Sequence, residues 1–249
     1  MVKITSEIAE VCGIHAGDGY LRNDGKRVEL DLSGNVEEKD YYNNHVIPLF
    51  NKTFNLNLIG RFFPSRNTYG FVIRDKKIIE FFHSLGFPYG SKSLNVKIPM
   101  LILKSKNKEI CASFLRGLFD TDGCLTFIKR TSGKYGNFKK THHYYPRLLL
   151  ITVSLELHKQ SMMLLNHLGF ESFSTWKYIP KISTENLKYS ICLNGTNNLI
   201  SWFDAVGSKN PVKFSRYLLW KKMGFCPTNS TFLERIEILK NKKDPSLPY

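Results

Sequence analysis

One pattern of apolar and small residues occurs twice along the chain. An apolar helical stretch ends in Asp-Gly at residues 18–19, and another does so at residues 122–123. Small residues recur at every fourth position in both stretches: Ala9, Gly13 and Gly17 in the first, and Ser113, Gly117 and Thr121 in the second. Positions four apart share one face of a helix, and a face of small residues lets two helix backbones approach closely. The pattern predicts that these two helices pack against each other.

Further apolar periodicities follow in the same order after each of these helices. The first copy predicts a helix ending at Asp18, a hairpin over 20–32, a helix over 39–53, strands over 56–63 and 69–73, and a helix over 76–85. The second predicts a helix over 109–122, strands over 125–130 and 147–154, a helix over 155–168, strands over 173–178 and 188–193, and a helix over 197–206. Residues 87–107 read as a linker, and 212–222 and 232–242 as extra helices.

A repeat of this length predicts two similar units rather than a solenoid. We expect an α+β fold with two pseudo-symmetric αββαββα repeats, over residues 1–104 and 105–249, each with one four-stranded antiparallel sheet.

Packing of the two small-residue faces would bring Asp18 and Asp122 side by side, at the negative ends of two helix dipoles. A single Asp-Gly after a helix is also an ordinary stop signal, but two copies with matched stripes favour a functional pair. Two carboxylates at one place repel each other unless a cation joins them. The pattern therefore predicts a divalent-metal site.

Composition narrows the class of partner. The 249 residues carry a formal net charge of +15, which implies an anionic partner, most simply nucleic acid. No run of about 18 apolar residues suggests a membrane span, and Glu7 and Glu10 make the N-terminal stretch unlike a signal peptide. Five cysteines without a CxxC pair read as reduced residues of an intracellular protein, in the cytoplasm, nucleoid or an organelle matrix.

The expected strands and their loops are rich in basic residues. A twisted antiparallel ribbon fits the major groove of DNA, and Lys and Arg contacts to phosphates supply affinity. We expect the following residues to contact DNA: Arg22, Lys26, Arg27, Glu29, Arg61, Arg66 and Arg74 in the first repeat, and Lys129, Arg130, Lys134, Lys139, Lys140 and Arg147 in the second.

The two Asp-Gly helices resemble the paired signature helices of the LAGLIDADG homing endonucleases. The second matches closely, with Leu115, Gly117, Leu118, Asp120, Asp122 and Gly123 in place. The first is looser, because Ala16 stands where the family often has its first Asp. The resemblance implies a monomer whose two sheets form a saddle over double-stranded DNA. It also implies an intron-encoded nuclease that cuts both strands of a long specific site and leaves staggered ends.

The expected ion is Mg²⁺, since the ligands are carboxylates and this ion keeps several waters. Asp18 and Asp122 are the predicted metal ligands, and the resemblance adds the backbone carbonyls of Gly17 and Thr121. A lysine near each scissile phosphate would stabilise developing charge. The matching Gly-Ser-Lys segments nominate Lys92 and Lys209, and Lys97, which precedes an Ile-Pro step as in the family, competes with Lys92.

Several assignments remain open from sequence alone. Glu37 and Glu38 follow the first hairpin, where the family often places a polar residue that organises water. Asp120 reads as a helix-end cap, and His15 as a packed core histidine. An RNA-binding intron maturase and a catalytically inactive DNA-binding protein of the same fold are the alternatives to the nuclease.

Overall fold

The protein is seen here as a computed structural model, which describes residues 3–129, 143–179 and 185–243. Each half opens with a helix that runs directly into a sheet. Helix α1 (Ser6–Asp18) is capped by Thr5, whose side chain accepts a hydrogen bond from the backbone of Ile8. Helix α6 (Lys108–Asp122) is capped in the same way by Asn107, whose side chain accepts from the backbone of Glu109. Such caps satisfy N–H groups that have no partner within the helix.

The first sheet follows α1. It consists of β1 (Gly19–Asn23), β2 (Val28–Asn35), β3 (Arg61–Phe63) and β4 (Thr68–Ile73), all antiparallel, in the order β1-β2-β4-β3. Between β2 and β3 the chain forms a 3₁₀ turn (Val36–Glu38), α2 (Lys39–Tyr41), a π-helical turn (Tyr42–Val46) and α3 (Ile47–Phe54), and α4 (Lys76–Ser84) follows β4. The alternating residues Leu21, Leu30, Leu32, Phe71 and Ile73 are buried against these helices.

The second sheet repeats this topology. It consists of β5 (Cys124–Ile128), β6 (Tyr145–Thr152), β7 (Ser174–Tyr178) and β8 (Lys188–Asn194), antiparallel in the order β5-β6-β8-β7. Helix α7 (Leu155–Leu168) lies between β6 and β7, and α8 (Thr196–Ala205) follows β8. Helices α9 (Pro211–Met223) and α10 (Phe232–Leu239) come last. The predicted α+β fold with two four-stranded antiparallel sheets is confirmed, and the sheets fall in the ranges 1–104 and 105–249.

Three local predictions need correction. Strand β3 is shorter than the predicted 56–63, because both backbone groups of Leu58 bond to the side chain of Asn51 instead of to a strand. The predicted helix over 39–53 is interrupted by the π turn, and Pro48 lies at the start of α3. The predicted linker contains the short helix α5 (Met100–Leu103), which contacts α6 and α7.

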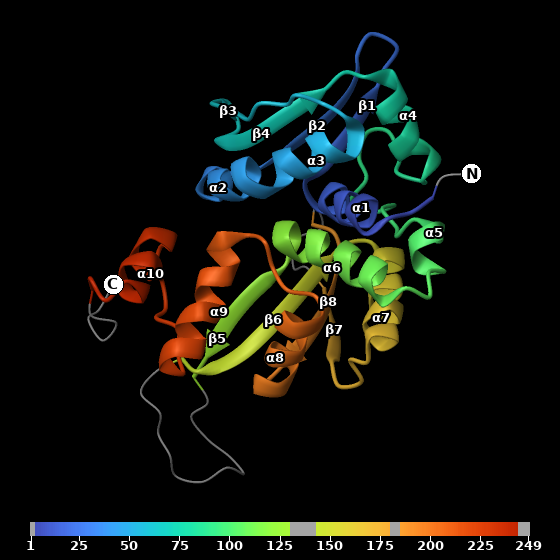
Figure 1. Cartoon of the computed structure of the whole chain (residues 1–249). Coiled ribbons are helices and arrows are strands. Elements are labelled where there is room, and N and C mark those ends of the chain that lie inside the picture. The colour runs from blue at the N-terminus through green and yellow to red at the C-terminus, as the bar shows by residue number, and fades with distance from the viewer. Residues whose placement is uncertain (1–2, 130–142, 180–184, 244–249) are drawn as a thin grey trace.

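Helices α1 and α6 form the main contact between the halves, as Figure 1 shows. A side chain at Gly13 would overlap the carbonyl oxygen of Phe114, and one at Gly117 would overlap that of Glu10. The backbones therefore touch along the predicted stripes of small residues. Beside them, the buried carboxylate of Glu10 accepts bonds from Arg116 at 2.6 and 3.1 Å.

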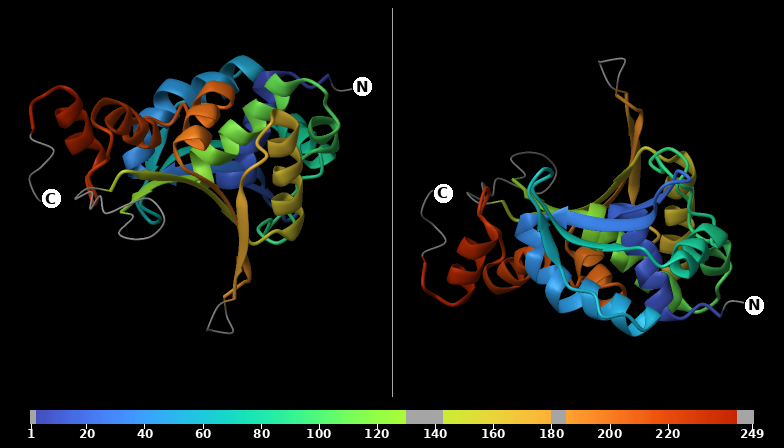
Figure 2. Two further views of the ribbon diagram at one scale, coloured as in Figure 1. Left: turned by 90° about the horizontal axis from the view of Figure 1, so that it is seen from below. Right: turned by 90° about the horizontal axis from the view of Figure 1, so that it is seen from above.

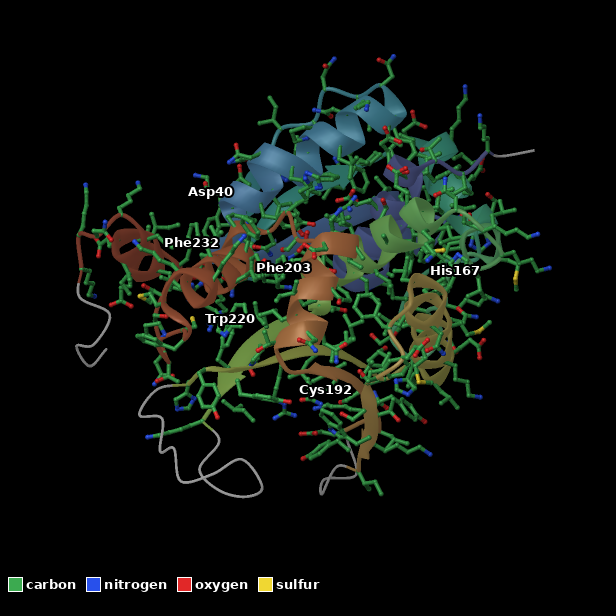
Figure 3. All side chains as sticks on the ribbon, turned by 60° about the horizontal axis from the view of Figure 1, so that its bottom comes forward. Asp40, His167, Cys192, Phe203, Trp220 and Phe232 are labelled. Carbon is green, nitrogen blue, oxygen red and sulfur yellow. The ribbon has the colours of Figure 1, made fainter. Side chains whose placement is uncertain are left out.

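Both sheets leave one face free of helices. Figure 2 shows the helices gathered on one side of the molecule, with both open sheet faces turned to the other side. Strands β7 and β8 form a hairpin that projects away from the body. Figure 3 shows Phe232 of α10 on the same side of the molecule as Asp40 of α2, with His167 of α7 on the opposite side. No helix in the described part of the chain is long and apolar enough to span a membrane.

Candidate functional site

The close contact of α1 and α6 brings together the carboxylates at their C-terminal ends. Gly17 directly precedes Asp18, and a Cβ added at Gly17 would lie 3.3 Å from Cγ of Asp122. The negative charge of Asp122 in turn helps to raise the pKa of Asp18. The structure thus contains the paired acidic helix ends that the sequence predicts.

Asp18 lies in a crowded corner of the first half. The hydroxyl of Tyr42 donates a hydrogen bond of 2.8 Å to Oδ2 of Asp18. A Cβ at Gly34 would lie 2.9 Å from Asp18 Oδ2 and equally far from Glu38 Oε2, so these two carboxylates are neighbours. Burial, followed by the charge of Asp122, raises the pKa of Asp18 to about 7, against the opposing bond from Tyr42. A carboxylate with this pKa is short of positive partners.

Asp122 lies in a more open corner. Its side chain is exposed, and in the described part of the chain no side chain donates a hydrogen bond to it. Loss of solvation still raises its pKa, while the positive charges of Lys92 and Lys213 act in the opposite direction. A recess of about 380 Å³ opens here, lined among others by Gly17, Lys92, Asp122 and Ile151. This recess offers room for water or a substrate oxygen beside the Asp122 carboxylate.

Two lysines cap the C-terminal ends of the paired helices. Nζ of Lys92 donates to the carbonyl oxygen of Gly17. Nζ of Lys213, on α9, donates to the carbonyls of Phe119, Asp120 and Thr121 at 2.6, 2.9 and 2.7 Å. Burial lowers the pKa of both ammonium groups, and the nearby Asp18 and Asp122 oppose that shift. Positive charge at these negative helix ends is favourable. Because Gly17 and Thr121 directly precede Asp18 and Asp122, both ammonium groups lie beside the acidic pair.

The sequence pattern nominates Lys209, not Lys213, for the second half. The side chain of Lys209 is exposed, whereas its backbone N–H donates to Oδ2 of buried Asp120 at 2.7 Å. The Ser208 hydroxyl donates to the other oxygen of Asp120. Burial raises the pKa of Asp120 to about 6, with these bonds opposing the shift. One signal could have identified Lys213: it lies in the first turn of a predicted helix, where the dipole disfavours a positive charge.

The other predicted site residues are more scattered. Lys97 is exposed, and its Cε points toward Gly86, where an added Cβ would meet it at 3.5 Å. Glu38 belongs to the site: burial raises its pKa, and it accepts a 2.6 Å hydrogen bond from Asn210. Glu37 instead accepts a bond from the backbone of Phe232 at the start of α10. His15 is buried between Phe82 and Phe87 as a core residue.

The donor atoms at the helix ends fit a hard divalent cation. They are the carboxylates of Asp18 and Asp122 and the carbonyls of Gly17 and Thr121, all oxygens. Each carbonyl oxygen has a second lone pair beside the one its lysine uses. The described residues hold no cluster of three or more His, Cys, Asp or Glu side chains arranged around a metal position. Few protein ligands and an adjacent recess suit an ion that keeps several waters, as Mg²⁺ does.

The open face of the first sheet carries arginines paired with acids. Arg66 bonds to Asp31 at 2.9 Å, and both Arg22 and Arg74 approach Glu29, at 3.8 and 3.5 Å. Arg61 and Arg66 also lie over the ring of Phe63. At the tip of the β1–β2 hairpin, the backbone groups of Lys26 and Arg27 bond to Asp24. The predicted DNA contacts of this repeat therefore share one surface or its rim.

The open face of the second sheet has a different chemistry. Arg147 lies 5.7 Å from the ring centre of Trp176, and Lys188 lies 5.5 Å from that of Tyr178. The four strands of this sheet contain no Asp or Glu. Lys129 is exposed at the end of β5. The predicted contacts Arg130, Lys134, Lys139 and Lys140 lie outside the described residues.

Comparison with known proteins supports the fold. No protein-family model and no curated protein sequence matches this chain. Among solved structures, it is similar to the LAGLIDADG homing endonuclease I-LtrWI bound to target DNA, with TM-score 0.54 and 15% identity over 96% of this chain and 98% of that one. Mesophilic variants of I-DmoI give 0.51 and 15% over 81% and 95%, and I-AabMI bound to uncleaved DNA gives 0.50 and 14% over 96% and 98%.

The chain shares its architecture with these structures: two α+β repeats in one chain, joined through paired helices, with two open sheet faces. This is the LAGLIDADG homing endonuclease fold, as the two signature helices predicted.

Proposed function

We propose that the protein is a site-specific endonuclease that hydrolyses both strands of double-stranded DNA. The observation that carries this proposal is the pair Asp18 and Asp122, held together at the ends of the touching helices between two open sheet faces. The net charge of +15 suits a polyanion. Homing endonucleases of this fold have been solved with target DNA, and one I-DmoI variant also in the presence of manganese.

The finer features of the activity follow from the arrangement. One chain carries both carboxylates and both sheets, so a monomer is sufficient. Because each sheet would contact its own stretch of major groove, the target is long. Two carboxylates serving two scissile phosphates would leave staggered ends, as in the family that the signature helices resemble. Oxygen ligands favour Mg²⁺ as the working ion.

The protein's own groups would divide the work. Asp18 and Asp122 would hold the divalent ions, which supply charge neutralisation, an activated water and stabilisation of the leaving oxygen. Lys92 and Lys213 keep two ammonium groups beside the carboxylates, where they can attract a phosphate and stabilise negative charge that develops on it. The arginines and lysines of the open faces would hold the DNA.

A cleavage assay against a randomised target library with Mg²⁺, Ca²⁺ or EDTA tests this proposal. We expect cutting of one long site with Mg²⁺, binding with little cutting with Ca²⁺, and no cutting with EDTA. Asp18→Asn and Asp122→Asn should each retain binding and lose at least about a thousandfold in cleavage rate. Absence of cutting by the wild type, in a library that contains its native insertion locus, would contradict the nuclease. Stimulation of intron splicing by both variants would then favour the maturase.

A further inference from the structure

The two carboxylates of the acidic pair are held in unequal ways. Tyr42 is fully buried and donates its hydroxyl proton to Asp18 at 2.8 Å. Its ring is fixed by edge contacts with Tyr41 and Tyr69, at centroid distances of 5.9 and 6.5 Å. Tyr42 also opens the π-helical turn, a local departure from α geometry of the kind that is frequent at functional sites. The orientation of Asp18 is thus constrained by a rigid donor.

The register of the sheets identifies the matching position in the second half. Tyr20, two residues after Asp18, pairs with Asp31, and Cys124, two residues after Asp122, pairs with Leu149. Tyr42 follows Asp31 by eleven residues, and Gln160 follows Leu149 by the same number. Gln160 is therefore the position in the second half that matches Tyr42.

Gln160 does not bond to the acidic pair. Its Oε1 accepts from the backbone N–H of Ile98 at 2.7 Å, and its Nε2 donates to Glu156 at 2.7 Å. In the described part of the chain, Asp122 therefore has no counterpart of Tyr42. Glu38 adds to the difference, since its side chain neighbours Asp18 and is held by Asn210.

We propose that Tyr42 is a positioning residue for Asp18 alone, so that the two strand cuts depend on different groups of the protein. This inference rests on the proposed nuclease function, in which each carboxylate serves one scissile phosphate. Loss of the Tyr42 hydroxyl would free the Asp18 carboxylate to rotate and would slow one cut. The other cut, served by Asp122, would keep its rate. The Tyr42→Phe variant would therefore act as a strand-biased nickase.

The test uses a target duplex whose strands carry different end labels, under single-turnover conditions with Mg²⁺. Tyr42→Phe keeps the ring and removes only the hydroxyl. We expect the rate for one strand to fall about tenfold, the scale of one lost hydrogen bond to a charged group, while the other stays within about twofold. Nicked duplex should accumulate. Titration of the protein–DNA complex with Mn²⁺, followed by electron paramagnetic resonance, should show weaker binding of one ion only.

Tyr69→Phe is the matched control. Its hydroxyl lies in the same aromatic cluster and donates to Asn43 at 2.8 Å, away from the carboxylates. It should leave the ratio of the two strand rates unchanged, and an unfolding midpoint near that of the wild type should confirm that each variant folds. Equal slowing of both strands by Tyr42→Phe, or the same bias in Tyr69→Phe, would overturn the assignment of Tyr42. A wild type that cuts neither strand would instead overturn the nuclease function on which it rests.

Discussion

The surroundings of Asp18 and of Asp122 are built on the same repeated helix pattern ending in Asp-Gly, but they differ in their side-chain contacts. Asp18 is half-buried, bonded to Tyr42 and next to Glu38. Asp122 is exposed and opens onto the recess. The repeat therefore preserves the backbone geometry that places two carboxylates together, while the side chains around each carboxylate have diverged.

The two lysine-bearing loops are anchored by different residues. In the second half, Asp120 binds the Ser208 hydroxyl and the N–H of Lys209 and so holds the loop against α6. The first half has Ala16 at the matching place, which offers no such acceptor. There the loop is held at Gly90, whose N–H donates to Leu21, and the Lys92 side chain turns to Gly17. In the second half, Lys213 from α9 takes the corresponding place.

The largest expected effect comes from a side chain that forces α1 and α6 apart and so separates Asp18 from Asp122. A Cβ at Gly117 would overlap the carbonyl oxygen of Glu10 and approach Ile14 N to 2.8 Å, and backbone atoms cannot move aside cheaply. Gly117→Ala should therefore lower the free energy of unfolding by about 3 kcal/mol or more, measured by urea denaturation. Cleavage should be lost with it.

Gly25→Ala is the control for this variant. Gly25 has φ 81° and open space around its Cα, so the cost there is only that of the left-handed backbone, about 1 kcal/mol. Equal destabilisation by the two variants would argue against backbone contact between α1 and α6.

The next effect separates the two candidate lysines of the second half. Lys213→Met removes the ammonium group that lies at the end of α6, and we expect cleavage to fall by about a hundredfold or more at unchanged DNA affinity. Lys209→Met removes an exposed side chain and keeps the N–H that bonds to Asp120, so its cleavage rate should stay within a few-fold. Single-turnover rates at saturating protein distinguish the two, and a larger loss in Lys209→Met would restore the symmetric assignment.

These differences show what the sequence could and could not predict. The repeat, the helix stripes and the Asp18–Asp122 pair follow from local periodicity and residue size. The four strands of each sheet follow from the alternation of apolar residues and the turn signals, whereas the strand order was not predicted. All of these depend on short-range pattern, which survives divergence of the two halves.

Side-chain contacts between segments that are distant in sequence could not be predicted from these short-range patterns. Lys213 comes from α9, a helix outside the repeat, and reaches α6 across more than ninety residues of sequence. Tyr42 reads from sequence as one more inward aromatic, and only its neighbour Asp18 distinguishes it from Phe50. The shortening of β3 depends on Asn51, whose side chain competes for the backbone of Leu58.

A pH effect of intermediate size should distinguish the two carboxylates. Asp18 has a pKa of about 7 in the folded protein, above its ordinary value of 3.8, so the folded state binds more protons than the unfolded state between these values. The free energy of unfolding should therefore decrease as pH rises from about 4 to 7. Since Asp18 is only half-buried, we expect its share to be about 1–2 kcal/mol.

Urea denaturation in EDTA across this pH range measures the slope. Asp18→Asn should flatten it more than Asp122→Asn, because Asp122 is more exposed. Saturating Mg²⁺ should flatten it in the wild type, since a bound cation favours the ionised carboxylates. A wild-type free energy of unfolding that rises through this range would contradict the predicted sign.

The smallest effect compares the open sheet faces. Arg74 of the first face shares Glu29 with Arg22, and each arginine must keep or give up this partner on meeting a phosphate. Arg147 of the second face lies over Trp176, in a sheet whose strands carry no acid. Arg147→Ala should therefore weaken DNA binding by about tenfold and Arg74→Ala by about threefold, while each lowers the slope of log K against log salt by about one.

Fluorescence anisotropy titrations in Ca²⁺ at several salt concentrations measure both quantities. Glu29→Gln sharpens the comparison, because it removes the competing charge and should bring the cost of Arg74→Ala in that background close to the cost of Arg147→Ala. If the cost of Arg74→Ala does not change in the Glu29→Gln background, the acid does not limit the arginine. The difference between the two faces would then arise from the stacking of Arg147 on Trp176.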